Sequence, residues 1–178
     1  YALVTAFDGY TATLYPMTAD LSPATGHAVT GKVLALANTS GKVAGSAFTV
    51  IGCDVLINGE VVATTGADGV FTIPSLAAGT YTATLSYAYG YDRDIKIMVA
   101  DGDVDLGTYG MVVCNFKKDA TIDASDYSAY KRATGKSSSD DAYNAACDFN
   151  HDGNIDATDY SIYKAFTGKN LNNDIYAC

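Results

Sequence analysis

Two segments of this chain repeat each other. Residues 114–136 (CNFKKDATIDASDYSAYKRATGK) and 147–169 (CDFNHDGNIDATDYSIYKAFTGK) align without a gap, and 14 of the 23 aligned positions are identical. Each copy is short, so a repeat this clear predicts two small supersecondary units that pack on each other. No other feature restricts the fold of the C-terminal third as strongly.

Each copy reads as an Asp-rich loop followed by a helix of about three turns. The residues that fall on one helix face by i, i+3 spacing are Tyr127, Tyr130 and Ala133 in copy one and Tyr160, Tyr163 and Phe166 in copy two. Gly135 and Gly168 stand where a helix C-cap is expected. The link 137–146 predicts a short helix of its own, capped by Ser139 or Asp140.

The loop of copy two has the spacing of a 12-residue calcium site. Calcium takes six to eight hard oxygen ligands, supplied from positions 1, 3, 5, 7, 9 and 12 of such a loop. Gly153 at position 6 permits the sharp turn, and position 12 is Asp rather than the usual Glu, so the helix must start closer to the ion. An Asx-rich turn without metal is the alternative. The predicted ligands are Asp148, Asn150, Asp152, the Asn154 carbonyl, Asp156 through a water, and Asp159.

The loop of copy one fits the pattern less well. Lys117 at position 3 cannot be a ligand, and Ala120 at position 6 lacks the conformational freedom of glycine. We therefore expect weaker calcium binding here, or a water in place of the third ligand. The predicted ligands are Asn115, Asp119, the Thr121 carbonyl, Asp123 and Asp126.

Duplicated loops with Asp at position 12, each followed by a helix, resemble the dockerin family. The resemblance covers residues 114–169. It implies calcium as the cofactor and, as partner, a cohesin module of a scaffoldin or cell-surface anchoring protein. By this resemblance the chain would incorporate or anchor its parent protein in a cellulosome-like complex for polysaccharide degradation, secreted and held at a bacterial cell surface.

The same resemblance implies that positions 10, 11, 17, 18 and 22 of each copy face the cohesin. These residues are Ala124, Ser125, Lys131, Arg132 and Lys136 in copy one, and Ala157, Thr158, Lys164, Ala165 and Lys169 in copy two. Small residues allow close approach and basic residues steer toward an acidic partner. The plainer alternative is that Lys and Arg only solvate the outer helix face. Because the copies nearly coincide, either helix is expected to dock after a half-turn rotation, biased by the Arg132/Ala165 and Ala133/Phe166 differences.

Residues 29–113 have the texture of a β-sandwich. Runs of β-branched and alternating residues (48–57, 70–73, 81–87 and 95–100) are separated by turn pairs such as Asn58-Gly59 and Asp68-Gly69. The segments VTGKVLA (29–35) and TTGADGVFTIPSLAAGTYTATL (64–85) resemble carboxypeptidase-regulatory-like and related Ig-like modules. Such a module directly before a dockerin resembles the X-module–dockerin pair, in which the X-module supports the dockerin.

The chain therefore predicts a two-domain protein, with an all-β Ig-like sandwich followed by a small all-α dockerin. The expected boundaries are 1–28 for N-terminal strands or a linker, 29–113 for the X-module and 114–178 for the dockerin. The net charge of −9 argues against nucleic acid as a partner. No run of 18 or more apolar residues is present, so we expect no membrane insertion. The last 65 residues contain ten Asp and no Glu, which favours short carboxylates placed for coordination.

Enzymatic activity finds little support. Neither His27 nor His151 has a Ser or Cys partner in a recognisable motif. The runner-up function is a carbohydrate-binding sandwich carried on a passive dockerin tether, with stacking tyrosines at positions 87, 89 and 91, although tyrosines on a half-buried strand more often pack. Cys53, Cys114, Cys147 and Cys178 form either disulfides, a Cys114–Cys178 clasp among them, or buried free thiols.

Overall fold

The computed structural model describes residues 5–7, 12–14, 26–35 and 48–168 of the chain. The first two strands, β1 (Thr5–Phe7) and β2 (Ala12–Leu14), pair with each other in an antiparallel sheet. They fall in the N-terminal region for which the sequence predicted strands or a linker.

The body of the protein is a sandwich of two sheets. In the three-stranded sheet, β3 (His27–Ala35) lies between β6 (Val70–Leu76), which is antiparallel to it, and β9 (Val104–Met111), which is parallel. The four-stranded sheet is antiparallel throughout and runs β5 (Glu60–Thr64), β4 (Asp54–Ile57), β7 (Gly79–Ser86) and β8 (Arg93–Val99).

Alternation of side chains along the strands makes the core of the sandwich. In β8, Ile95, Ile97 and Val99 are buried while the residues between them are exposed, as expected for a strand with one face on a core. Val33 and Phe71 of the other sheet are likewise buried. The inner faces of the two sheets are thus apolar, which is the pattern that the sequence predicted for residues 29–113.

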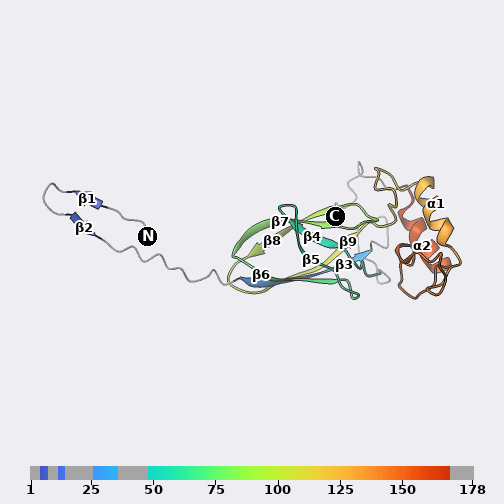
Figure 1. Cartoon of the computed structure of the whole chain (residues 1–178), viewed down its shortest axis with the longest axis horizontal. Coiled ribbons are helices and arrows are strands. Elements are labelled where there is room, and N and C mark those ends of the chain that lie inside the picture. The colour runs from blue at the N-terminus through green and yellow to red at the C-terminus, as the bar shows by residue number, and fades with distance from the viewer. Residues whose placement is uncertain (1–4, 8–11, 15–25, 36–47, 169–178) are drawn as a thin grey trace.

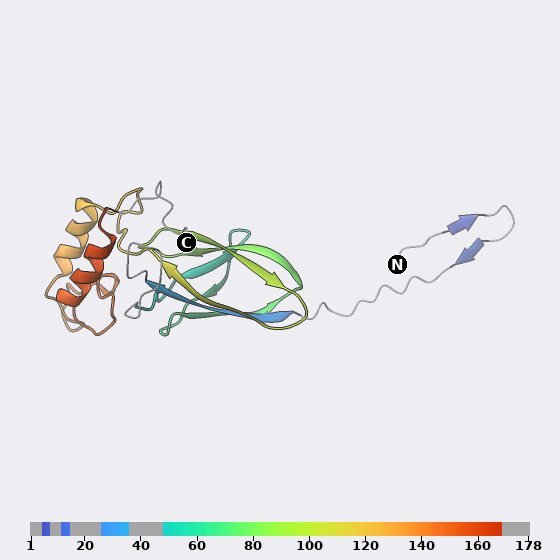
Figure 2. The same cartoon turned by 180° about the vertical axis from the view of Figure 1, so that it is seen from behind.

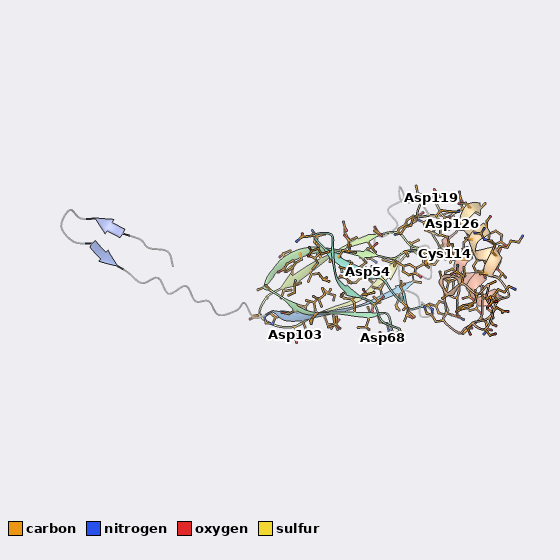
Figure 3. The ribbon with its side chains drawn as sticks, viewed as in Figure 1. Asp54, Asp68, Asp103, Cys114, Asp119 and Asp126 are labelled. Carbon is orange, nitrogen blue, oxygen red and sulfur yellow. The ribbon has the colours of Figure 1, made fainter. Side chains whose placement is uncertain are left out.

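Two helices lie beyond one end of the sandwich. They are α1 (Ala124–Ala133) and α2 (Ala157–Phe166), and both views of the ribbon place them side by side there (Figures 1 and 2). Figure 3 labels Cys114, Asp119 and Asp126 at this end of the sandwich and Asp103 at the opposite end. The first loop is therefore close to the sandwich, and the second loop reaches it through His151, whose ring lies against the Thr49 carbonyl.

The expectation of an all-β domain followed by a separate all-α domain is wrong. The described chain is mostly sheet with two helices of ten residues each, and a single buried cluster continues from the sandwich into the repeat. The Phe116 ring centroid lies 5.5 Å from that of Tyr89 and 6.4 Å from that of Phe149. Two short helices bury little apolar surface by themselves, so the end of the sandwich completes their core. The fold is mixed α and β.

The link between the two copies also differs from its prediction. Instead of a helix capped by Ser139 or Asp140, it forms turns and then a 3-10 turn over Ala145–Cys147, capped by the Asn144 side chain. Asp140 instead accepts hydrogen bonds from the backbone N–H and the hydroxyl of Ser137. Among the described residues, no helix is long and apolar enough to cross a membrane.

Candidate functional site

Both helices start in the same way, at the acidic end of a loop. Asp123 and Asp156 are the N-cap residues, and the carboxylates of Asp126 and Asp159 reach back to the backbone N–H of those caps at 3.0 and 2.9 Å. Each pair is a capping box, here built from two Asp residues. Positions 9 and 12 of each predicted calcium loop therefore also begin the helix.

Loop two buries two carboxylates. Asp148 and Asp159 are only 2% and 0% exposed. Asp159 Oδ1 accepts the Phe149 N–H at 2.7 Å, while Asp148 Oδ2 accepts the Gly153 N–H at 2.8 Å and the Tyr143 hydroxyl at 2.6 Å. Burial raises the pKa of Asp159, and the charge of Asp148 adds to this effect. A pair of buried like charges of this kind favours a bound cation.

The other predicted ligands of loop two lie at its outer side. Asn150 is half-buried, and Asp152, Asn154 and Asp156 are exposed. The Asn150 amide donates to Asp152 at 2.8 Å, and this bond and the Asn154 N–H lower the pKa of Asp152. In the described ranges, no group of three or more His, Cys, Asp or Glu side chains is arranged to hold a metal ion. The fit of calcium to this loop therefore rests on its oxygen chemistry and on the two buried charges.

Loop one has the same outline but a different interior. Its position-1 residue is Asn115, which is 1% exposed, and its buried carboxylate is Asp126. Asp126 Oδ1 accepts the Lys117 N–H at 3.0 Å. The remaining predicted ligands, Asp119, Thr121 and Asp123, lie along the rim, where Asp123 caps α1.

The two copies hold each other through reciprocal hydrogen bonds. The Tyr130 hydroxyl of α1 donates to the Asp156 carbonyl at 3.0 Å, and the Tyr163 hydroxyl of α2 donates to the Asp123 carbonyl at 2.9 Å. The signal for these bonds was the tyrosine found at the same position in both copies.

A second reciprocal pair lies where each helix ends. Gly135 and Gly168, in the left-handed conformation at φ 77° and 83°, donate their N–H groups to the Ile155 and Ile122 carbonyls at 2.8 and 2.9 Å. Each helix therefore fixes positions 8 and 9 of the loop in the other copy. Sequence reasoning expected the glycine caps but not these contacts.

Comparison with known proteins agrees with this architecture. A family model described as "Dockerin type I domain" matches residues 116–166. Residues 116–166 form a dockerin.

Two solved structures extend the likeness to the sandwich. They are an N-terminal and a C-terminal interface mutant of a type II cohesin–X-dockerin complex from Acetivibrio cellulolyticus. Their identities to this chain are 26% and 28% and their TM-scores 0.58 and 0.59, and each match covers 82% of this chain and 97% of the other. The sandwich in front of the dockerin is an X-module. A search of curated proteins found no match.

The X-module contacts both loops of the dockerin. Lys118 Nζ lies 3.1 Å from an Asp92 carboxylate oxygen, and the Asn115 N–H donates to the Tyr89 carbonyl at 2.8 Å. In loop two, His151 Nε2 lies 3.0 Å from the Thr49 carbonyl oxygen. Lys118 and His151 are both position 4 of their loops and both have positive φ, 53° and 57°. The same loop position thus serves as a contact with the X-module in each copy.

The predicted cohesin-facing residues mostly lie at the surface. Those that are exposed are Ala124, Lys131, Arg132, Ala157, Thr158 and Lys164, and those that are half-buried are Ser125, Lys136 and Ala165. Lys169 lies outside the described residues. Ala133 and Phe166 are buried, so of the two differences expected to bias orientation only Arg132/Ala165 lies on the surface.

Tyrosines gather along the line where the two helices meet. Tyr130 and Tyr163 are buried and stack with ring centroids 5.5 Å apart, while Tyr127 and Tyr160 are more than a third exposed and lie 6.1 Å apart. Lys164 Nζ lies 5.1 Å from the Tyr160 ring centroid, within the range of a cation–π contact. The buried tyrosines, Tyr130 and Tyr163, belong to the helix faces predicted from the i, i+3 spacing, and these faces pack on each other.

The tyrosines proposed for sugar stacking do not form a platform on a strand. They follow the end of β7 at Ser86, and Tyr91 is 2% exposed. Tyr87 and Tyr89 are half-buried and contact each other edge to face, with centroids 5.7 Å apart. Tyr89 also packs on Phe116 of the dockerin. Because these tyrosines pack on other side chains of the protein, their arrangement argues against a sugar-stacking site.

Cys53, Cys114 and Cys147 are buried free thiols, so of the two alternatives for the cysteines these three follow the second. Cys178, and with it the question of a Cys114–Cys178 clasp, lies outside the described residues.

Proposed function

We propose that this chain is a calcium-dependent docking module that binds a cohesin and thereby incorporates or anchors its parent protein in a cellulosome-like extracellular complex. The observation that carries the proposal is the match over 82% of the chain, X-module included, to X-dockerins solved in complex with a type II cohesin. The partner is then a cohesin module of a scaffoldin or of a bacterial cell-surface anchoring protein.

Calcium is the ion that loop two is proposed to hold. Asp148, Asn150, Asp152 and Asp159 would supply side-chain oxygens, Asn154 its carbonyl, and Asp156 a contact through water. Calcium supplies the positive charge that two buried carboxylates need, while the capping boxes and the reciprocal tyrosine bonds orient the helices. The surface that these helices present for docking is formed by the exposed and half-buried residues named above at positions 10, 11, 17, 18 and 22.

The X-module is proposed to act as structural support. It contacts position 4 of both loops and shares a buried cluster with them. These contacts would restrain the conformation of both loops. Dockerins and X-modules are docking modules without catalytic activity, and we propose no catalysis for this part of the parent protein. The boundary at residues 113/114 is proposed to separate modules that are distinct in sequence but folded on a common core.

A pull-down of the whole chain against type I and type II cohesins, with calcium and with excess EGTA, tests the proposal. Both classes belong in the panel because the family model is of type I and the structural matches are of type II. We expect capture by at least one cohesin in calcium and none in EGTA. Capture that persists in EGTA would reject calcium dependence, and no capture by either class would reject the function. The Met98→Ala variant, changed on exposed β8 of the X-module, is the matched control.

A further inference from the structure

The two loops differ in how much negative charge they bury. Loop two buries Asp148 and Asp159, whereas at the same positions loop one buries Asn115 and Asp126. The carboxylate of Asp126 accepts two backbone N–H groups, those of Lys117 and Asp123, each at 3.0 Å, as Asp159 does in loop two, so the difference in buried charge lies at position 1. It also stands in the first turn of α1, where the helix dipole favours an anion. Loop one therefore has no pair of buried charges for a cation to neutralise.

Asn115 closes loop one in a way that a carboxylate cannot. Its Oδ1 accepts the Asp119 N–H at 3.2 Å and its Nδ2 donates to the Asp119 carbonyl at 2.9 Å. A carboxylate only accepts hydrogen bonds, so Asp at this position would leave the Asp119 carbonyl without this donor. The amide thus uses both of its polar groups to join position 1 to position 5 of the loop. The Asn115 oxygen is also neutral, so it would attract a calcium ion at position 1 less strongly than the Asp148 carboxylate does in loop two.

The backbone of loop one also takes a different path. In loop two, Gly153 at position 6 has φ 85° and donates its N–H to Asp148. Ala120, at the same position of loop one, does not have positive φ, whereas position 4 has positive φ in both loops, at Lys118 and His151. Lys117 at position 3 is exposed and has no oxygen in its side chain. Positions 1, 3 and 6 of loop one thus have other residue types than in loop two, and position 6 also has another backbone conformation.

Copy two supports loop one from outside, just as copy one supports loop two. The Tyr163 hydroxyl and the Gly168 N–H, both from copy two, hold the Asp123 and Ile122 carbonyls of loop one. The end of loop one and the start of α1 are therefore fixed from outside the loop. This support does not require an ion in loop one.

We propose that loop one is a metal-free loop, closed by the Asn115 amide, and that one calcium ion in loop two organises both copies through the reciprocal bonds. The proposal rests on the calcium-dependent docking proposed above and departs from the expectation of two calcium sites. In this proposal loop two needs calcium to fold correctly, and loop one does not.

Calcium stoichiometry of the whole chain tests the proposal. Isothermal titration calorimetry and native mass spectrometry are expected to find one bound calcium ion per chain. Two bound ions with cohesin capture intact would overturn this inference and leave the docking function standing. No bound ion would overturn the inference as well, and loss of capture in the same preparation would then count against the docking function.

Exchanging the position-1 residues gives a matched pair of variants. Asp148→Asn is expected to weaken calcium binding at least tenfold, because loop two loses one of its two buried charges. Asn115→Asp is expected to lower the thermal midpoint measured in EDTA, because it removes the donor to Asp119 and adds a buried charge. An unchanged or higher midpoint in EDTA for Asn115→Asp would contradict the closing role of the amide.

Conversion of loop one to the residues of loop two gives the reverse test. The triple variant Asn115→Asp, Lys117→Asn and Ala120→Gly is expected to bind two calcium ions. If it still binds one, these three positions do not account for the difference between the loops and the proposal falls. Circular dichroism in saturating calcium checks that the variant is folded before the ions are counted.

Discussion

Tyr130 and Asp156 join the two copies of the repeat: the tyrosine hydroxyl in the first helix donates to the backbone carbonyl at the start of the second, 3.0 Å away. Asp156 is at once the N-cap of α2 and position 9 of loop two. A single hydrogen bond thus couples the first helix to loop two, and Tyr163 and Asp123 repeat the contact in the opposite direction.

Removal of these hydroxyls should destabilise the dockerin while leaving its packing in place. We expect Tyr130→Phe and Tyr163→Phe each to lower the free energy of unfolding by about 1 kcal/mol, because each removes one of the two hydrogen bonds that the carbonyl at a helix start accepts. Urea denaturation in saturating calcium measures the effect. Tyr160→Phe, at an exposed ring of the same helix pair, is the control and should change stability by less than about 0.5 kcal/mol. Equal losses in all three variants would contradict the special role of the two buried hydroxyls.

The Tyr143 hydroxyl should tune the calcium loop from outside it. It donates to Asp148 at 2.6 Å, and this bond raises the pKa of Tyr143 to about 12. Partners of this kind orient a ligating carboxylate, and their loss typically weakens metal binding about 10-fold or more. We therefore expect Tyr143→Phe to weaken calcium binding about tenfold in a calorimetric titration, with the number of bound ions unchanged. Unchanged affinity would mean that Asp148 is oriented by the loop backbone alone.

The shared core predicts that the X-module and the dockerin unfold together. Phe116 is half-buried between Tyr89 of the X-module and Phe149 of loop two. Phe116→Ala should cost about 2 kcal/mol, less than the loss for a fully buried Phe. Far-ultraviolet circular dichroism, followed at helix and sheet wavelengths in denaturant, should give coincident transitions for the unchanged chain. Two separate transitions would show that the two parts are independent domains after all.

The sequence predicted the two helices better than it predicted the order of strands in the sheets. The helices were predictable because caps and repeat spacing are local signals: Asp123 and Asp156 cap them, and Gly135 and Gly168 follow their ends. The parallel pairing of β3 with β9 joins residues more than seventy positions apart, and alternation of side chains alone does not reveal which strands are neighbours.

The prediction of separate domains failed because the sequence pattern changes from strand-like to helical at Cys114, and this change was taken to mean that the two parts have separate cores. Phe116 and Phe149, identical apolar residues at position 2 of largely polar loops, were the signal that these loops face a buried surface. The difference between Ala120 and Gly153 was visible in the sequence. Its consequence for the backbone required the structure, which gives positive φ to Gly153 and not to Ala120.

The thiol of Cys53 offers a test of the X-module core that does not involve the dockerin loops. Its side chain is fully buried, and burial, with smaller contributions from Asp54 and Asp92, raises the pKa of this thiol to about 12. Only the thiolate reacts readily with alkylating reagents, and a group with this raised pKa stays protonated at pH 8. Cys53 should therefore resist iodoacetamide at pH 8 in the folded chain and react once the chain is unfolded in urea. Peptide mass spectrometry locates the label, and rapid native labelling of Cys53 would show that the two sheets of the X-module do not close over it.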